Sequence, residues 1–298
     1  MSFRPSRIGQ IFGQDHIQEL LLKWEQDISL IPQSLLLAGP YGTGKTSIAR
    51  ILARQLITAE NDLYEINASE SRGIDDVRGW AEATRFSPFG KSKVFIADEL
   101  HQLTPAAQSA LLKVIEEPPK GTYWFLCTTD PAKLLPAIRS RCTPLEIKLL
   151  TKEANSDLLT FVTKGALSAQ LIDQLYYHTA GHARDAVKAA EIAISSGIQN
   201  IEQMRDIIGA SPEEIRRLLC NLLAGQGNPE EFIPLIKMPD STLLTSIFDN
   251  LIDEAAMKGN LKVSKNYCDF LKMRALRKQW LISSQEQVLH AITICLMV

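Results

Sequence analysis

Residues 39–46 read GPYGTGKT, a glycine-rich stretch that fits the pattern G-x-x-x-x-G-K-[ST]. An apolar run, Ser34–Ala38, precedes the stretch, and a helical pattern from Ser47 to Leu56 follows it. In such a strand–loop–helix unit the glycines let backbone N–H groups surround phosphate oxygens, and the amino end of the helix faces the same anions. We therefore expect a nucleoside triphosphate to bind here, with Lys45 neutralising the β- and γ-phosphates and the Thr46 hydroxyl holding Mg²⁺. The predicted nucleotide-binding residues of this stretch are Gly39, Pro40, Tyr41, Gly42, Thr43, Gly44, Lys45, Thr46 and Ser47.

A second motif ends another apolar run. Residues 94–99 read VFIADE, a strand pattern that finishes in two acids, Asp98 and Glu99. Because an unpaired charge is costly to bury, acids at the end of a buried strand indicate a function. Asp98 can organise Mg²⁺ and its waters, and Glu99 can polarise the attacking water. The two motifs together predict hydrolysis of the bound nucleotide rather than binding alone.

The order of strand-like and helical patterns predicts the domains. Up to about residue 148 the two patterns alternate, as in an α/β protein, and the strand-like runs are apolar throughout, which suits a parallel sheet covered on both faces. After Thr151 the spacing is helical, with a break at Ala180-Gly181, and a further helix start (SPEE) stands at 211–214. The expected strands are 34–38, 63–67, 93–97 and 123–127, and the expected domains are 1–148 (α/β), 149–209 (helical) and 210–298 (all-helical).

Composition excludes several classes of protein. The 298 residues are 45% hydrophobic and 22% charged, and the formal charge of −2 argues against a nucleic-acid coat, although it leaves room for a local basic strip. No apolar run suggests a membrane span, and the first residues lack the apolar stretch of a secretory signal. The five cysteines are scattered without a Cys-x-x-Cys pair, so neither zinc nor a disulfide framework is expected. We expect a cytoplasmic or nuclear protein, or one of the host cytoplasm if it is viral.

Several further stretches within roughly residues 1–210 resemble AAA+ clamp-loader ATPases. Arg4-Pro5, followed by IFGQDH at 11–16, is similar to the opening of these proteins, which implies that Arg4 and Phe12 line the adenine pocket. The stretch NASESRGIDDVR at 67–78 resembles the replication factor C small subunits. The remaining matches resemble the bacterial gamma/tau clamp-loader subunit: DELH at 98–101, ALLK at 110–113, EEPP at 116–119, TTDP at 128–131 and SRC at 140–142.

The resemblance assigns roles to single residues. Thr129, together with Thr128, corresponds to the sensor at the end of a central strand, close to the γ-phosphate and the attacking water. Arg141, of the Ser-Arg-Cys triplet, corresponds to the arginine finger that reaches the ATP of a neighbouring subunit, with Arg139 as the weaker candidate. Such a finger contributes about 10³–10⁵ in rate, so hydrolysis would depend on assembly. Arg184, in GHARDA at 181–186, corresponds to a second sensor on a helical lid.

The resemblance also implies partners and an order of domains. It implies an AAA+ domain at 1–148, a helical lid at 149–209 and an oligomerising collar at 210–298. The implied cofactors are ATP and Mg²⁺, and the implied partners are other loader subunits in a homo- or hetero-oligomer of five, a sliding clamp and primer-template DNA. Arg72 and Arg78, at an expected helix start, are candidates for phosphate contacts with DNA, and the alternative is solvated arginines offset by neighbouring acids. The cysteine-ligated zinc module of the bacterial subunit is missing, which favours the replication factor C or phage pattern, or a compact bacterial variant.

Three functions remain in competition. The preferred one is an ATPase subunit that opens the clamp on ATP binding, places it on primer-template DNA and releases it on hydrolysis. The second is a non-hydrolysing structural subunit that donates Arg141, against which the intact Lys45, Thr46, Asp98 and Glu99 argue. The third is another AAA+ DNA-associated motor, such as a branch-migration motor or a replication initiator. The Ser-Arg-Cys triplet, and a helical tail without a winged-helix pattern, argue against the third.

Overall fold

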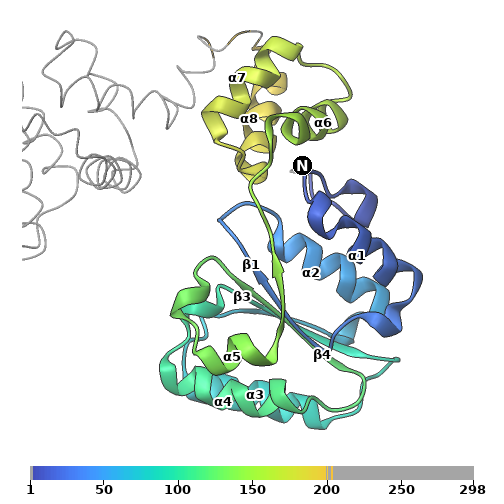
Figure 1. The fold of residues 1–298 in the computed structure, drawn as a ribbon, viewed down its shortest axis with the longest axis vertical. Helices are drawn as coiled ribbons and strands as arrows, with labels where there is room; N and C mark the ends of the chain where they lie inside the picture. The colour runs from blue at the N-terminus through green and yellow to red at the C-terminus, as the bar shows by residue number, and fades with distance from the viewer. Residues whose placement is uncertain (1–2, 199, 201–202, 204–298) are drawn as a thin grey trace, which may run out of the picture. The chain divides into compact units, whose positions relative to one another are not determined.

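The computed structural model describes residues 3–198, 200 and 203, and their centre is a five-stranded sheet (Figure 1). Every pair of neighbouring strands is parallel, in the order β2-β3-β4-β1-β5. The predicted α/β fold with a parallel sheet is therefore confirmed. The strands are β1 (Ser34–Ala38), β2 (Leu63–Asn67), β3 (Lys93–Asp98), β4 (Thr122–Thr128) and β5 (Thr143–Glu146).

Helices connect the strands and continue after the last of them. The chain divides into two compact units, Met1–Ile172 with Gly181–Ile194, and Asp173–Ala180 with Ser195–Val298. The sheet belongs to the first unit, and the described part of the second contains the last turns of α7. The helices are α1 (Asp15–Gln26), α2 (Lys45–Leu56), α3 (Ile74–Arg85), α4 (Pro105–Glu116), α5 (Pro136–Arg141), α6 (Lys152–Thr163), α7 (Ala169–Thr179) and α8 (Ala183–Ser195).

The sheet is apolar on both faces because helices cover both. Successive strand residues point to opposite faces, so Leu35 and Leu37 pack with α1 and α2, whereas Leu36 packs with α3, α4 and α5. Figure 1 shows the two helical layers on either side of the sheet. On the second face Phe95 stacks between two aromatic rings, with centroid distances of 4.7 Å to Tyr64 and 4.4 Å to Trp124. This burial explains why the strands read as continuous apolar runs.

The strand order brings the two predicted motifs together. β1 lies between β4 and β5, with Ala38 opposite Thr128, and β3 lies between β2 and β4, with Asp98 opposite Asn67. Because all five strands are parallel, the carboxyl ends of β1, β3 and β4 lie at one edge of the sheet. Ligands of open α/β sheets bind outside this edge, where the strand order reverses. Residues that are about 50 positions apart in the chain, such as Thr46 and Asp98, can therefore meet.

The structure differs from the predicted elements in several places, and β3 and β4 extend one or two residues beyond the expected 93–97 and 123–127. The helix expected from Ser47 begins at Lys45, and the strand β5 was not predicted because it is only four residues long and contains Pro144. The expected break at Ala180-Gly181 is confirmed, since both residues have positive φ, 49° and 78°. The domain boundaries near 148 and 209 stay predictions. The predicted collar, residues 210–298, lies outside the described residues.

Candidate nucleotide site

The loop between β1 and α2 forms a cradle of backbone N–H groups. Gly44, the residue that caps α2, has φ of 101°, a left-handed conformation that side chains disfavour, and no side chain caps the helix. The first amides of α2 therefore remain available to an anion, and the positive end of the helix dipole favours one. A side chain at Gly39 would collide with the carbonyl of Ile147 at the end of the neighbouring chain segment, so only glycine fits this turn.

Lys45 is almost buried beneath this loop. Its side chain is only 6% exposed, and its Nζ donates to the carbonyl oxygens of Gly39 and Pro40, each at 2.8 Å. Burial lowers the pKa of Lys45, and the charge of Arg184 acts in the same direction, although Glu99 and Asp98 oppose the shift. A phosphate group bound in the cradle would supply the counter-charge that burial in a carbonyl-lined site lacks.

Thr46 and Asp98 meet across the carboxyl edge of the sheet. The Thr46 hydroxyl donates to Asp98 Oδ2 at 2.6 Å, and the other carboxylate oxygen accepts from the backbone N–H of Glu99 at 2.9 Å. Hard oxygen donors of this kind suit Mg²⁺, which binds through one or two protein oxygens together with substrate phosphates and waters. The pair therefore fits the predicted Mg²⁺ ligands. In residues 3–198, 200 and 203 no group of three or more His, Cys, Asp or Glu side chains could hold a metal ion.

Glu99 is held in an unusual backbone conformation. Its φ and ψ are 53° and 39°, in the left-handed region, which costs a residue with a side chain roughly 1–2 kcal/mol. Its carboxylate lies 3.5 Å from His101 Nε2, and His101 Nδ1 lies 3.2 Å from the hydroxyl of Thr128. Thr128 is fully buried, and its hydroxyl also accepts from the backbone N–H of Asp130 at 3.1 Å. The adjacent Thr129 is half-buried. The predicted water-polarising acid and the predicted sensor segment therefore lie on one chain of contacts through His101, a residue to which the sequence analysis gave no role.

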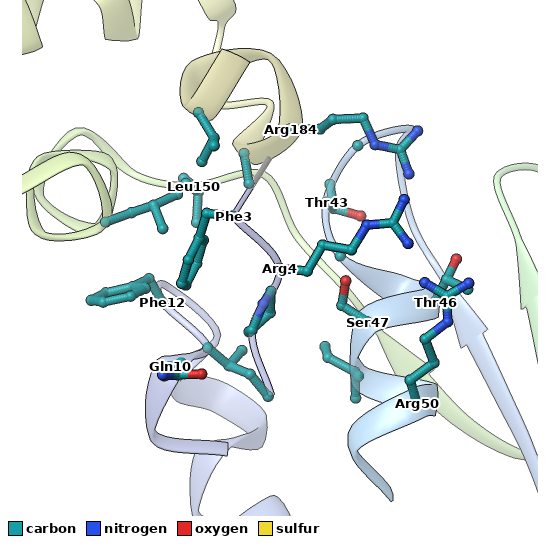
Figure 2. Close-up of a pocket in the computed structure, with 18 of the residues that line it drawn as sticks. Phe3, Arg4, Gln10, Phe12, Thr43, Thr46, Ser47, Arg50, Leu150 and Arg184 are labelled. Atoms are coloured by element: carbon teal, nitrogen blue, oxygen red, sulfur yellow. The ribbon is translucent and has the colours of Figure 1, made fainter. Parts of the chain in front are cut away.

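A cavity of about 480 Å³ extends from the loop toward the amino-terminal segment (Figure 2). One end is polar and contains Thr43, Thr46 and Asp98, and Figure 2 shows the side chains of Arg4 and Arg184 reaching toward it from two different segments. The other end is apolar and is lined by Phe3, Ile11, Phe12, Leu150, Leu158 and Val187. A polar end beside an apolar end matches a ligand that carries phosphates on a flat aromatic base.

The apolar end is assembled from segments far apart in the chain. Phe3 and Phe12 both contact Phe161 of α6, with ring centroids 5.7 and 5.6 Å apart. Gln14 is buried, and its side-chain amide makes two hydrogen bonds to the backbone of Lys148. Its Nε2 donates to the Lys148 carbonyl at 2.8 Å, and its Oε1 accepts from the Lys148 N–H at 3.0 Å. The amino-terminal GQ motif therefore fixes the segment that enters α6. No local pattern marks Phe3 or Leu158, because their partners lie about 150 residues away.

The segment before α8 contacts the phosphate loop directly. The Arg184 backbone N–H donates to the carbonyl of Gly42 at 3.0 Å, and His182 Nδ1 lies 2.7 Å from the carbonyl oxygen of Tyr41. The Arg184 guanidinium lies over the Tyr41 ring, 4.8 Å from its centroid, and donates to the Tyr41 hydroxyl at 2.8 Å. Arg184 lines the cavity, whereas the lining residues do not include Tyr41, and the role of Arg184 as a second sensor stays a prediction.

Not all of the predicted residues line the cavity: its lining leaves out Gly39, Pro40, Tyr41, Lys45, Glu99, Thr128 and Thr129, and it also leaves out the three predicted arginines Arg72, Arg78 and Arg141. Arg141 ends α5, where its guanidinium pairs with Glu116 at 2.9 Å and donates to the Ala137 carbonyl at 3.2 Å. Arg72 donates to the Ser69 carbonyl at 2.7 Å, and Arg78 pairs with Asp75 at 2.8 Å. These arginines do not join the nucleotide cavity of their own chain, so any role for them requires a second molecule.

Comparison with known proteins connects this geometry to one group of replication proteins. A family model described as "DNA polymerase III, delta subunit" matches residues 58–151. The gamma/tau subunit of DNA polymerase III from Mycobacterium tuberculosis is 29% identical over 290 residues, which covers 87% of this chain and 46% of that protein. The replication factor C small subunit of Aeropyrum pernix is 29% identical over 232 residues, 75% of this chain and 71% of that protein. The chain is related to the AAA+ clamp-loader subunits.

The solved structures agree on the fold. A RuvB Holliday junction branch migration motor of Thermotoga maritima superposes with a TM-score of 0.60 at 18% identity, covering 85% of this chain and 91% of that one. A gamma subunit-related protein of the same organism gives 0.52, also at 18% identity, over 92% and 98%. At these identities the likeness establishes the AAA+ fold alone. The chain spans about half (46%) of the length of the gamma/tau relatives. No helix in the described part of the chain is long and apolar enough to cross a membrane.

Proposed function

We propose that this chain is an ATPase subunit of a sliding-clamp loader. ATP binding would open the clamp and place it on primer-template DNA, and hydrolysis would release it. The observation that carries the nucleotide chemistry is the contact between Thr46 and Asp98 at 2.6 Å, beside a free helix amino end and the buried Lys45. The relation to clamp-loader subunits supports the choice of process, since relatives are named as DNA polymerase III and replication factor C subunits.

The side chains divide the chemistry between binding and turnover. Lys45 and the amides of α2 would hold the phosphates, while Thr46 and Asp98 would hold Mg²⁺, which neutralises phosphate charge when bound. Glu99 would accept hydrogen bonds from the attacking water and orient it, and His101 and Thr128 lie behind its carboxylate. Thr129 would meet the γ-phosphate from the end of β4. Phe12 would contact the base at the apolar end, whereas Arg4, expected beside the adenine, reaches toward the polar end (Figure 2) and would contact the phosphates or the ribose.

The proposed assembly includes other loader subunits in a ring of five, a clamp and DNA. In it Arg141 would act on the ATP of a neighbouring subunit, and Arg72 and Arg78 would contact DNA phosphates. The intact set of Lys45, Thr46, Asp98 and Glu99 favours an active ATPase over the alternative of a passive structural subunit. The chain is 29% identical in sequence to a gamma/tau subunit over most of its length, whereas its likeness to a branch-migration motor is one of fold alone. This difference favours the clamp-loader assembly.

Nucleotide titration of the purified chain tests the first step. Calorimetry with ATP and Mg²⁺ should detect binding to the wild-type chain, and Lys45→Ala should weaken it by roughly 100-fold because the phosphates lose a desolvated counter-charge. Lys23→Ala, which removes an exposed lysine of α1, is the matched control and should bind as the wild type does. Equal affinity of Lys45→Ala and the wild type would refute the nucleotide site.

A further inference from the structure

The side chain of Tyr41 supports Arg184 from outside the cavity. Tyr41 occupies a variable position of the glycine-rich loop, and its ring is half exposed, at 50%. Its hydroxyl accepts from Arg184 Nη1 at 2.8 Å, and its ring lies 4.8 Å from the guanidinium carbon. A tyrosine at this place therefore offers both a hydrogen-bond acceptor and a π face to one cation.

The position of the two side chains shows which way the arginine faces. Arg184 lines the cavity, but Tyr41 does not belong to its lining. The guanidinium has five N–H donors, and the Tyr41 hydroxyl uses one of them, so donors remain for a ligand in the cavity. Thr43, Thr46 and Asp98 line the polar end of the cavity toward which the Arg184 side chain reaches (Figure 2).

Backbone contacts hold the same junction in place. The carbonyl of Tyr41 faces His182 Nδ1 at 2.7 Å, and that of Gly42 accepts from the Arg184 N–H at 3.0 Å. The consecutive loop residues Tyr41 and Gly42 are thus linked to His182 and Arg184 at the start of α8. A long arginine side chain that is otherwise exposed loses rotamer entropy when it binds an anion, and a partner that orders it beforehand reduces that cost.

We infer that Tyr41 is a positioning residue that orders Arg184 over the phosphate end of the cavity before nucleotide binds. This inference rests on the proposed nucleotide site and adds to it a residue that acts through Arg184. Tyr41 therefore contributes to ATP affinity only while Arg184 is present. The hydroxyl and the ring contribute separately, because one accepts a hydrogen bond and the other provides a cation–π contact.

A double-mutant cycle on the full chain, read by calorimetric titration with ATP and Mg²⁺, tests the inference. Tyr41→Ala should weaken ATP binding about three- to tenfold, and Tyr41→Phe, which keeps the ring, should weaken it by about twofold. Arg184→Ala should weaken it by about tenfold. The double variant should be no more than about twofold weaker than Arg184→Ala alone, because Tyr41 has then lost the group it orders.

Lys188 provides the matched control. Lys188 is an exposed cation one turn further along α8 and also lines the cavity. The loss of ATP affinity in Lys188→Ala should therefore multiply with the loss in Tyr41→Ala, because Tyr41 does not order Lys188. Independent, multiplying losses for Tyr41 and Arg184 would overturn the inference, as would tighter ATP binding by Tyr41→Ala. Unchanged affinity of Arg184→Ala would also overturn it and would leave the nucleotide site intact. Failure of the nucleotide site itself is recognised separately, by Lys45→Ala binding ATP as the wild type does.

Discussion

The nucleotide cavity and the exposed arginines of α3 and α5 differ in where their partners lie. Beside the cavity, Lys45 is buried beneath the loop at 6% exposed, and Thr46 contacts Asp98 at the carboxyl edge of the sheet, so the groups that would hold phosphates and Mg²⁺ converge within one chain. By contrast, the side chain of Arg78 is 64% exposed, and that of Arg141 is 35% exposed. Each of these arginines pairs with an acid of its own chain at the surface. When one subunit holds the whole ligand, the structure of that subunit contains all residues of the site. When two molecules share a site, the structure of one chain contains only half of the residues.

The ion pairs of the arginines are weak enough to be exchanged. A solvent-exposed pair contributes about 0–1 kcal/mol, so Arg141 can leave Glu116, and Arg78 can leave Asp75, at little cost. This contrast gives a rule for experiments. Substitutions of the residues that would hold ATP should change ATP binding by the isolated chain, whereas substitutions of Arg78 and Arg141 should act only in the assembly with other subunits or DNA.

The largest effect expected is that of Arg141→Ala. In the assembly of this chain with its partner subunits, steady-state ATP hydrolysis should fall about 10³-fold, because the transition state loses a cation supplied from the neighbouring subunit. The isolated variant should bind ATP as the wild type does, as calorimetry can check. Arg139→Ala, an exposed neighbour on the same helix, is the control and should keep most of the activity. Equal hydrolysis by the Arg141→Ala and wild-type assemblies would remove the finger role.

Glu99→Gln, next to the cavity-lining Asp98, should have the next largest effect. The amide keeps the size of the side chain but no longer polarises water, so hydrolysis should slow about 10²-fold while ATP remains bound. Calorimetry on the isolated chain and single-turnover hydrolysis by the assembly separate the two quantities. Glu117→Gln, an exposed acid after α4, is the control. If ATP affinity and the rate of hydrolysis fell together, Glu99 would have a structural role in the nucleotide site rather than a role in polarising water.

The phosphate end could be predicted from the sequence because its chemistry is local. Residues 39–46 carry the backbone cradle, the lysine and the hydroxyl in one turn, and the acids stand at the end of β3, which parallel pairing through β4 brings to the same edge of the sheet. The apolar end is different, since Phe3, Phe12, Leu158 and Val187 come from three segments that only the folded chain brings together. The resemblance to clamp loaders implied Arg4 and Phe12 there, and of these only Phe12 lies at the apolar end, because the Arg4 side chain reaches toward the polar end (Figure 2). The role of His101 depends on Thr128, which is 27 residues away, and no spacing rule links the two.

Phe12→Ala should separate the two ends of the cavity. The ring would stack on or beside the base, so its loss should weaken ATP binding by about tenfold. It should leave binding of inorganic pyrophosphate unchanged, whereas Lys45→Ala should weaken both ligands. Competition titrations with ATP and pyrophosphate on the isolated chain make this comparison. Phe86→Ala, which removes an aromatic ring that is 72% exposed, is the control. Equal losses for both ligands in Phe12→Ala would mean that the variant disturbs the loop rather than the base end.

The smallest effect concerns Arg72 and Arg78 at the start of α3. Arg72 holds the Ser69 carbonyl, and Arg78 pairs with Asp75, so both are satisfied in the chain alone. If DNA phosphates replace these partners, Arg72→Ala with Arg78→Ala should weaken primer-template binding by a similar factor for every sequence, because phosphates carry no base information. Each lost contact should reduce the slope of log affinity against log salt by about 0.9 for duplex DNA.

The measurement is fluorescence anisotropy of labelled primer-template DNA at several salt concentrations, with the assembled loader, its clamp and ATP. Asp75→Asn is an informative companion, because it frees Arg78 from its partner and removes a negative charge from the same surface. If Arg72 and Arg78 contact DNA, Asp75→Asn should tighten primer-template binding by a few-fold at low salt. The effect should fade at high salt, because salt screens the charges of the surface. DNA-stimulated hydrolysis should fall with binding in the double alanine variant, while hydrolysis without DNA persists. An unchanged slope together with unchanged affinity would assign both arginines to the solvated surface of α3. The contrast between the cavity and the arginines would then rest on Arg141 alone.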